Sequence, residues 1–293
     1  MKWYIPAKTF LLGEYAAIAE ASAIILTTTP YFELALNHND SVTGIHPDSP
    51  AGVWWRQEQN THKGLSFHDP YNDKGGLGAS SAQFLGSYLA SCYLNKTLPD
   101  LNTMLAAYYH SSWSGVGLRP SGYDVIAQSQ GGCVYINKQN KIVESYQWPF
   151  NDLSLFLLHT GVKLATHHHL QATTLPIQIS QLSAIVDKAK QAFDQINSEQ
   201  LLNAINDYHH KLTELNLVAQ HSLDFITHLK TTNPEILAIK GCGALGADVL
   251  LILTTKNDAP LLKNKLSAQN WSLLATEENG TPINKSPIIT NRL

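Results

Sequence analysis

The alternation of hydrophobic and polar positions changes character along the chain. Residues 3–5, 23–28 and 31–36 are rich in β-branched and aromatic side chains and are separated by Pro and Gly, which predicts three short strands. Residues 38–75 are polar and rich in turn formers, which indicates a long connection that holds short strands or a lid. From residue 80 to 94 the apolar side chains recur at helical spacing, which predicts the first strong helix.

The rest of the chain mixes helices and strands in two halves. A second helix is expected at 101–109, and a hairpin at 133–148 with its turn at 138–140. Further strands are expected at 153–158, 249–253 and 271–275, and further helices at 182–196, 198–229 and 259–266. Strands followed by mixed elements indicate an α+β fold. A break near 150–152 predicts an N-terminal domain, 1–150, and a C-terminal domain, 151–293.

Composition narrows the class of protein. The chain has 293 residues, 44% of them hydrophobic and 15% charged, which is ordinary for a globular protein. A net charge of −3 argues against a nucleic-acid surface built on overall basicity. Three widely spaced cysteines frame neither a disulfide scaffold nor a zinc site. The start lacks a signal peptide and no apolar run approaches the roughly 20 residues needed to span a bilayer. We therefore expect a cytoplasmic protein without a membrane partner; the sequence is compatible with a homodimer but does not determine the oligomeric state.

A glycine-rich segment, residues 75–82, runs directly into the first strong helix. Its glycines let backbone N–H groups approach a ligand closely, and the free N–H groups of a helix N-terminus attract anions. The serines can cap the helix, and the Ser80 hydroxyl can bind the Mg²⁺ that accompanies a polyphosphate. The segment is neither a P-loop nor a dinucleotide fingerprint. An anion site and a plain, well-capped helix remain alternatives on these residues alone.

This segment resembles the second signature of the GHMP kinases, Gly-Leu-Gly-Ser-Ser-Ala-Ala, with Ala79 in place of the first serine. The resemblance implies that ATP binds here. The cofactor-binding residues would be Gly76, Leu77, Gly78, Ala79, Ser80 and Ser81.

Residues 6–18 are similar to the first signature of the same family, a Pro-x-Lys strand followed by Gly-Glu-(His/Tyr)-Ala. Lys8, at a strand end beside a phosphate loop, would neutralise charge on the transferring group. The resemblance implies that Glu14 and Tyr15 contact the substrate. The Gly-Glu-Tyr-Ala form is typical of bacterial phosphomevalonate kinases, whereas His usually follows Glu in mevalonate kinases. A solvated lysine at a strand rim is the simpler interpretation of Lys8 alone.

Residues 119–125 resemble the family's Ser-Gly-x-Asp stretch, which places Asp124 near the acceptor. A carboxylate there can take or orient the proton of an alcohol while Lys8 favours its ionised form. A phosphate acceptor needs no proton removed, so Asp124 does not distinguish the two acceptors. Ser121 and Gly122 would contact the substrate. Arg119 is a candidate for binding a substrate carboxylate or phosphate, and a surface ion pair is the alternative.

Residues 240–249 are similar to the family's third glycine signature. Leu245 and Ala247 stand where the family has glycine, which weakens the case for close phosphate approach, and a structural turn is the alternative. The resemblance implies substrate contacts at Gly243 and Ala244.

A fourth, weaker similarity, residues 160–166, makes Lys163 and Thr166 candidates for substrate binding. The adjoining histidines 167–169 point in different directions in any regular element, which argues against a metal site.

Four signatures in family order imply the GHMP kinase fold, with a ribosomal-protein-S5-like N-terminal domain and a ferredoxin-like C-terminal domain. They imply direct phosphoryl transfer from ATP with Mg²⁺ to a small anionic substrate in the cleft between the domains. Phosphomevalonate kinase is the favoured member, mevalonate kinase is the alternative, and a catalytically silent protein that kept the fold is a third hypothesis. Diphosphomevalonate decarboxylase fits less well because those enzymes generally lack the Pro-x-Lys lysine.

Overall fold

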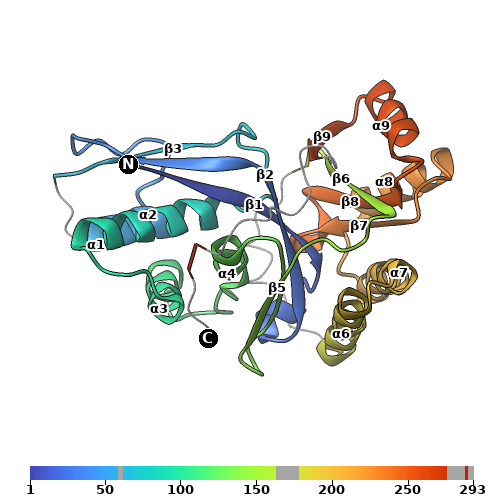
Figure 1. Ribbon diagram of the computed structural model, residues 1–293, viewed down its shortest axis with the longest axis horizontal. Helices are drawn as coiled ribbons and strands as arrows, with labels where there is room; N and C mark the ends of the chain where they lie inside the picture. Colours follow the sequence, from blue (N-terminus) through green and yellow to red (C-terminus); the bar gives the residue numbers. More distant parts are fainter. Residues whose placement is uncertain (59–61, 163–177, 276–287, 290–293) are drawn as a thin grey trace.

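The structure is a computed structural model that describes residues 1–58, 62–162, 178–275 and 288–289 (Figure 1). The N-terminal half contains an antiparallel sheet in the order β1-β2-β4-β5, with β3 also paired to β2. Its strands are β1 (Lys2–Leu12), β2 (Ala23–Leu36), β3 (Leu65–His68), β4 (Cys133–Asn137) and β5 (Ile142–Tyr146). Because β1 ends this order, its outer edge is left for other segments to pair with.

Four helices lie on one side of this sheet (Figure 1): α1 (Pro50–Gln57), α2 (Ala79–Asn95), α3 (Leu101–Ser112) and α4 (Tyr123–Gln130). Local capping sets two of their starts. Ser49 accepts the Gly52 N–H at the start of α1, and Asp100 accepts the Thr103 N–H at the start of α3. By contrast, α2 and α4 begin after the glycines Gly78 and Gly122, which have positive φ angles. Of these four helices, the two that start without a capping side chain, α2 and α4, are those of the candidate site.

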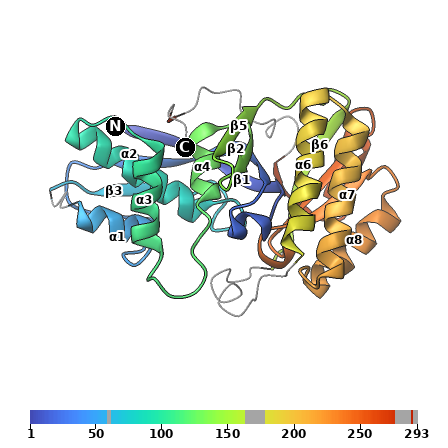
Figure 2. The same cartoon turned by 90° about the horizontal axis from the view of Figure 1, so that it is seen from below.

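The C-terminal half contains a second antiparallel sheet in the order β7-β8-β6-β9. Helices α6 and α7 lie side by side next to it (Figure 2) and pack into the main hydrophobic core, whereas α8 and α9 form a smaller core on the other face of the sheet. The elements are β6 (Leu153–His159), α6 (Ile179–Gln195), α7 (Ser198–Glu214), α8 (Gln220–Thr232), β7 (Ala238–Cys242), β8 (Val249–Thr255), α9 (Ala259–Ala268) and β9 (Ser272–Ala275). Two 3-10 turns, η1 (Ala16–Ala19) and η2 (Ala244–Gly246), complete the description.

One hydrophobic core runs through both halves. Alternate residues of β6 point to opposite faces, so Leu155 and Leu157 join the main core while Phe156 and Leu158 join the smaller one. The main core also contains Ile5 and Ile25 of the first sheet. The two sheets are therefore held against each other by shared apolar packing, which fixes the loops that lie between them.

The observed elements confirm the predicted α+β class, the strong helix after the glycine-rich segment and the hairpin at β4–β5. The predicted break between strands 23–28 and 31–36 is wrong, because β2 continues through Pro30. Helix α4 was not predicted: it has only eight residues, and its buried side chains lie all round it, so no apolar stripe marks it. Among the described helices, none is long and apolar enough to cross a membrane.

Candidate active site

The edge of β1 carries the glycine-rich loop. The Lys8 N–H donates to the Leu77 carbonyl at 2.9 Å, so the loop lies along the outer edge of the strand. Gly78 has a φ angle of +82°, and a Cβ placed there would lie 2.7 Å from Lys8 Cγ. Glycine is required at this position both for the left-handed backbone and for the close approach of the lysine stem. The first two signatures of the sequence thus meet in space.

The start of α2 presents its backbone N–H groups without a side-chain cap. Gly78 is the N-cap residue and has no side chain to accept a hydrogen bond. Ser81 is buried, and its hydroxyl donates back to the Gly78 carbonyl at 3.0 Å, whereas Ser80 is exposed in the first turn. The expectation that the serines cap the helix is therefore wrong. First-turn N–H groups that no side chain caps carry partial positive charge and suit an anion.

Lys8 faces Asp124 across this loop. Lys8 Nζ lies 3.1 Å from Asp124 Oδ1, and the exposed fractions of the two side chains are 9% and 34%. Asp124 occupies the first turn of α4, where a carboxylate is favoured by the helix dipole. The ion pair brings together the two residues that the sequence predicts to be catalytic. The ammonium is mostly buried, and the Asp124 side chain is partly exposed although its Oδ1 atom is buried.

Gln128 locks the loop, β1 and α4 together, and sequence analysis missed it. Its side chain is fully buried, and Nε2 donates to the Pro6 carbonyl at 2.8 Å and to the Gly78 carbonyl at 3.1 Å. It lies one helical turn after Asp124, on the same helix. The only signal in the sequence is that spacing of four, which is shared by many surface pairs.

The third glycine segment packs onto the second. Gly76 has a φ angle of +85°, and a Cβ there would lie 2.9 Å from Asp248 Cβ and 2.7 Å from Val249 Cγ2. Gly243 has a φ angle of +82°, and apart from its chain neighbours no described residue has an atom within 4 Å of a Cβ built there. The Thr160 N–H donates to the Asp248 carbonyl at 3.1 Å, which brings in the end of β6. The segments 6–18, 75–82, 119–125 and 240–249 therefore meet at one place in the fold.

The two residues that replace family glycines in this segment adopt different solutions. Leu245 has a φ angle of +52°, which a glycine would adopt more easily, and the Tyr15 hydroxyl accepts its N–H at 3.0 Å. Ala247 has φ −86° and ψ −39°, which any residue adopts. The backbone at Leu245 therefore has a conformation that favours glycine, whereas the backbone at Ala247 does not require glycine.

Glu14 and Tyr15 are buried rather than turned to solvent. The Glu14 carboxylate pairs with Lys240 at 2.5 Å, with exposed fractions of 4% and 0%. Burial alone lowers the pKa of Lys240, but Cys242 and Glu14 together hold that pKa above its ordinary value. Burial raises the pKa of the Tyr15 hydroxyl to about 12. The Glu14 carboxylate is thus paired with Lys240 of β7. The predicted substrate contacts of Glu14 and Tyr15 stay predictions.

Arg119 forms the surface ion pair that was the alternative to substrate binding. Its Nη2 lies 2.5 Å from Glu20 Oε1, and its guanidinium lies 4.4 Å from the centre of the Tyr109 ring. Ser121 and Gly122 precede α4, and the Ser121 carbonyl accepts the Tyr109 hydroxyl at 2.9 Å. The pKa of Glu20 is lowered, first by the hydrogen bond from Lys138 and then by Arg119.

A second lysine, Lys74, lies at the start of the glycine-rich loop. Lys74 directly precedes Gly75, and its Nζ donates to the Ser272 hydroxyl of β9 at 2.9 Å. The pKa of His159 is lowered, mainly by burial and then by the charge of Lys74. A lysine next to a glycine loop could have been noticed in the sequence, but nothing local places it beside the other sheet.

Two predicted substrate residues, Lys163 and Thr166, and the histidines 167–169 lie outside the described residues. Across the part of the chain that the structure describes, no group of three or more His, Cys, Asp or Glu side chains could hold a metal ion.

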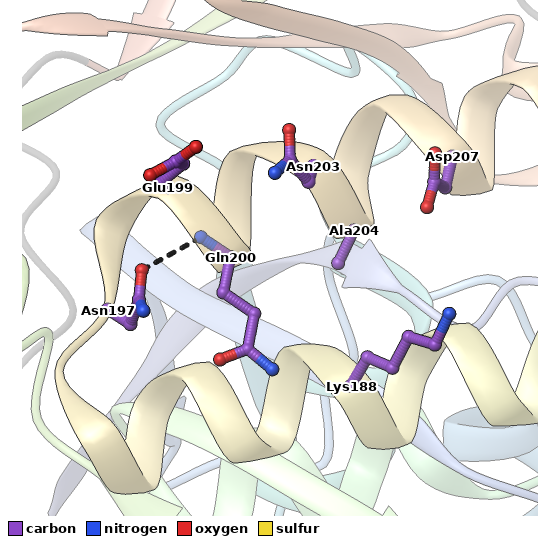
Figure 3. A pocket seen from close by; sticks show the side chains of 7 residues that line it. All are labelled: Lys188, Asn197, Glu199, Gln200, Asn203, Ala204 and Asp207. Atoms are coloured by element: carbon purple, nitrogen blue, oxygen red, sulfur yellow. Dashed lines mark hydrogen bonds between the residues drawn. The ribbon is translucent and has the colours of Figure 1, made fainter.

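A polar pocket of about 380 Å³ lies between α6 and α7 (Figure 3). Side chains from both helices line it, and the Gln200 N–H donates to Asn197 Oδ1 at its edge at 3.0 Å. The pocket belongs to the helical layer of the C-terminal half, and Lys8 and Asp124 are not among its lining residues. Those residues are Lys188, Asn197, Glu199, Gln200, Asn203, Ala204 and Asp207.

The fold now defines a class. Over its full length the chain has the two-sheet α+β fold of the GHMP kinases, with the four signature segments gathered where the two sheets meet. No protein-family model matches the sequence, and no curated protein matches it either.

Several solved structures superpose on this fold over nearly the whole chain. A mevalonate kinase of Methanococcus jannaschii superposes with a TM-score of 0.72 at 16% identity, covering 97% of this chain and 98% of the other. A Streptococcus pneumoniae phosphomevalonate kinase in complex with phosphomevalonate and AMPPNP gives 0.77 at 15% identity, with 97% and 100% covered. A mevalonate pyrophosphate decarboxylase of Streptococcus pyogenes gives 0.71 at 11% identity, with 97% and 98% covered. At these identities the likeness establishes the fold and leaves the reaction to be argued from the site.

Proposed function

We propose that this chain is an ATP-dependent kinase that phosphorylates a small anionic substrate of the mevalonate type. The observation that carries the proposal is the contact of 3.1 Å between Lys8 and Asp124 beside the uncapped start of α2. A mostly buried ammonium, a partly exposed carboxylate side chain and a helix N-terminus supply charge neutralisation, acceptor orientation and anion binding within one site.

The residues at the loop fit the polyphosphate of ATP. Gly76 and Gly78 both have positive φ angles, and the first-turn N–H groups of α2 are not bound by a capping side chain. Such a loop and helix start suit phosphate oxygens. Mg²⁺ bound with ATP would neutralise phosphate charge. Mg²⁺ in such sites is held mainly by phosphates and water, so one protein ligand is enough. We assign the Ser80 hydroxyl to that role, because it is exposed in the first turn of α2.

Lys8 and Asp124 take distinct roles in the proposed transfer. Lys8 stabilises negative charge on the transferring phosphoryl group, since its ammonium is mostly buried beside the loop. With an alcohol acceptor, Asp124 accepts the hydroxyl proton as the new P–O bond forms. With a phosphate acceptor no proton is removed, and Asp124 orients the acceptor and holds Lys8 in place. In both cases the bond to ADP breaks as the new bond forms.

We propose 5-phosphomevalonate as the acceptor, with 5-diphosphomevalonate as the product. The Gly-Glu-Tyr-Ala sequence at residues 13–16 supports this choice. Lys74 supports it as well, because a second ammonium beside the loop favours a substrate that carries both a carboxylate and a phosphate. The Streptococcus pneumoniae neighbour was solved with phosphomevalonate. Mevalonate kinase is the alternative within the same fold.

The test is ADP release and product mass with mevalonate and 5-phosphomevalonate side by side. We expect turnover with 5-phosphomevalonate, and we expect Lys8→Met to lower kcat on the order of 1,000-fold. Lys2→Met is the matched control, because Lys2 lies on the same strand with a side chain that is 54% exposed. Preference for mevalonate would overturn the choice of acceptor. ATP binding without turnover on either acid would favour the catalytically silent protein, for which the replaced glycines at Leu245 and Ala247 are the argument.

A further inference from the structure

The turn between β4 and β5 carries a lysine, Lys138, that contacts the segment preceding α4. Lys138 Nζ donates to Glu20 Oε1 at 2.6 Å, to the Tyr109 hydroxyl at 2.7 Å and to the Ser121 carbonyl at 3.2 Å. Its side chain is only 11% exposed. An ammonium has three N–H donors, and here three acceptors from three different segments surround it.

Each of these acceptors belongs to an element that builds the site. Glu20 directly follows η1, which itself follows the strand and turn that carry Lys8 and Glu14. Tyr109 lies on α3, and its hydroxyl donates to the Ser121 carbonyl at 2.9 Å. Ser121 is the residue before Gly122, the N-cap of α4. The lysine therefore joins the residue that follows η1, α3 and the start of α4 at one point.

Lys138 also contacts the start of α4 through its backbone N–H. The Lys138 N–H donates to the Tyr123 hydroxyl at 3.1 Å, and that hydroxyl donates to the Ala21 carbonyl at 2.9 Å. Tyr123 is fully buried and is the first residue of α4, next to Asp124. Gly122, the N-cap residue, has no side chain that could cap the helix, and the Tyr123 N–H donates to the Ser121 hydroxyl at 3.3 Å. Lys138 adds contacts on both sides of Gly122, to the Ser121 carbonyl and to the Tyr123 hydroxyl.

We infer that Lys138 is a positioning residue for the phosphoryl transfer: it fixes the entry of α4 so that Asp124 faces Lys8 at ion-pair distance. The inference rests on the proposed kinase function. Lys138 itself acts through Ser121 and Tyr123 and not on the substrate. Arginine would not replace it, because a planar guanidinium cannot direct three N–H groups to acceptors arranged around a single nitrogen.

The test compares Lys138→Met with Lys141→Met, an exposed lysine on the same turn. We expect Lys138→Met to lower kcat about 10- to 100-fold, because a small misplacement of Asp124 is enough to cost that much. The KM for ATP should stay within about twofold, since the α2 loop is untouched. Lys141→Met should leave kcat unchanged. An unchanged kcat in Lys138→Met would overturn the inference.

A double variant separates positioning from general destabilisation. In an Asp124→Asn background, Lys138→Met should lower kcat by less than about twofold, because residues that act through one another are not additive. The same fold loss in both backgrounds would overturn the inference. If Lys138→Met does not fold, Tyr109→Phe removes only the hydroxyl between Lys138 and Ser121 and is expected to show the same dependence on Asp124.

A crystal structure of Lys138→Met tests the inference without any turnover. The Lys8 Nζ to Asp124 Oδ1 distance should increase from 3.1 Å to beyond ion-pair contact. A distance that stays at its present value would overturn the positioning role. A wild-type chain that turns over no acceptor would instead remove the proposed function, while this structural comparison would still decide what Lys138 does.

Discussion

Gly78 and Lys8 lie so close that a single methyl group would collide between them. A Cβ on Gly78 would lie 2.7 Å from Lys8 Cγ and 2.9 Å from Lys8 Cε, and 3.1 Å from Gln128 Nε2. The glycine is thus required by the lysine that passes beside it, in addition to its left-handed backbone. The loop and the Lys8 side chain can therefore only move together.

Gly78→Ala should therefore damage catalysis more than stability. The displaced Lys8 would lose its alignment with Asp124, and we expect kcat to fall about 100-fold. Gly117→Ala is the control: Gly117 has a similar φ angle of +75°, but apart from its chain neighbours no atom of the described residues lies within 4 Å of a Cβ built there. Both variants carry the strain of a left-handed backbone, and Gly78→Ala adds the collision with Lys8. Its urea midpoint should therefore drop further than that of Gly117→Ala, and only Gly78→Ala should lose activity. Equal activity in the two variants would contradict the argument.

The buried pair between Glu14 and Lys240 should contribute to stability as a unit. Glu14→Gln leaves the ammonium of Lys240, whose side chain is 0% exposed, without its counter-charge. Breaking such a pair from one side should lower the free energy of unfolding by about 3–5 kcal/mol. Urea denaturation measures this directly. Glu14→Gln combined with Lys240→Met should cost less than the sum of the single changes, because the second change removes the orphaned charge.

A control for this pair is Lys2→Met, which removes a lysine from an exposed pair with Glu33. Water screens such a pair, so its loss should not measurably change the urea midpoint. A loss of stability as large as that of Glu14→Gln would mean that burial is not what makes the Glu14 pair important.

Much of the site could be predicted from sequence because its signals are local. The glycines around Leu77 and the helical spacing that follows them are contained in about twenty consecutive residues. Lys8 and Asp124 were found because each lies in a short motif, and the structure brings them together. The fold class followed from the order of strands and helices along the chain.

The rest of the site depends on contacts between distant residues. Glu14 has the same local sequence whether it faces substrate or core, and its partner Lys240 is 226 residues away. The local sequence of Lys138 indicates only a turn, because its partner Glu20 is 118 residues away. Gln128 reaches Pro6 across 122 residues. No periodicity or propensity encodes such pairs, since they form only once segments that are distant in the sequence have packed together.

Acid should destabilise the chain in part through His209. Burial, and then the charges of Lys230 and Lys240, lower the pKa of His209 from 6.5 to about 4. The unfolded chain therefore binds a proton that the folded chain does not between these two pH values. The stability from neutral His209 is complete above pH 6.5 and is lost as the pH falls toward 4, by at most about 3 kcal/mol.

Urea denaturation at pH 7 and at pH 4.5 checks this, with His209→Gln beside the wild type. The loss of unfolding free energy between the two pH values should be smaller in His209→Gln, since the other titrating groups are unchanged. His210→Gln changes the exposed neighbour and should retain the wild-type loss. The same pH dependence in wild type and His209→Gln would rule out this assignment.

Lys74 should distinguish a phosphorylated acceptor from an unphosphorylated one. Its ammonium stands at the start of the glycine loop and contacts Ser272 of the second sheet, so its charge can serve an anion placed between them. Lys74→Met should raise the KM for 5-phosphomevalonate about tenfold, the cost of about one charge-assisted hydrogen bond. The KM for mevalonate should change far less, because that acid lacks the second anionic group. Lys96→Met, at the exposed far end of α2, is the matched control and should alter neither value. Equal increases for both acids would show that Lys74 supports the loop and does not select the acceptor.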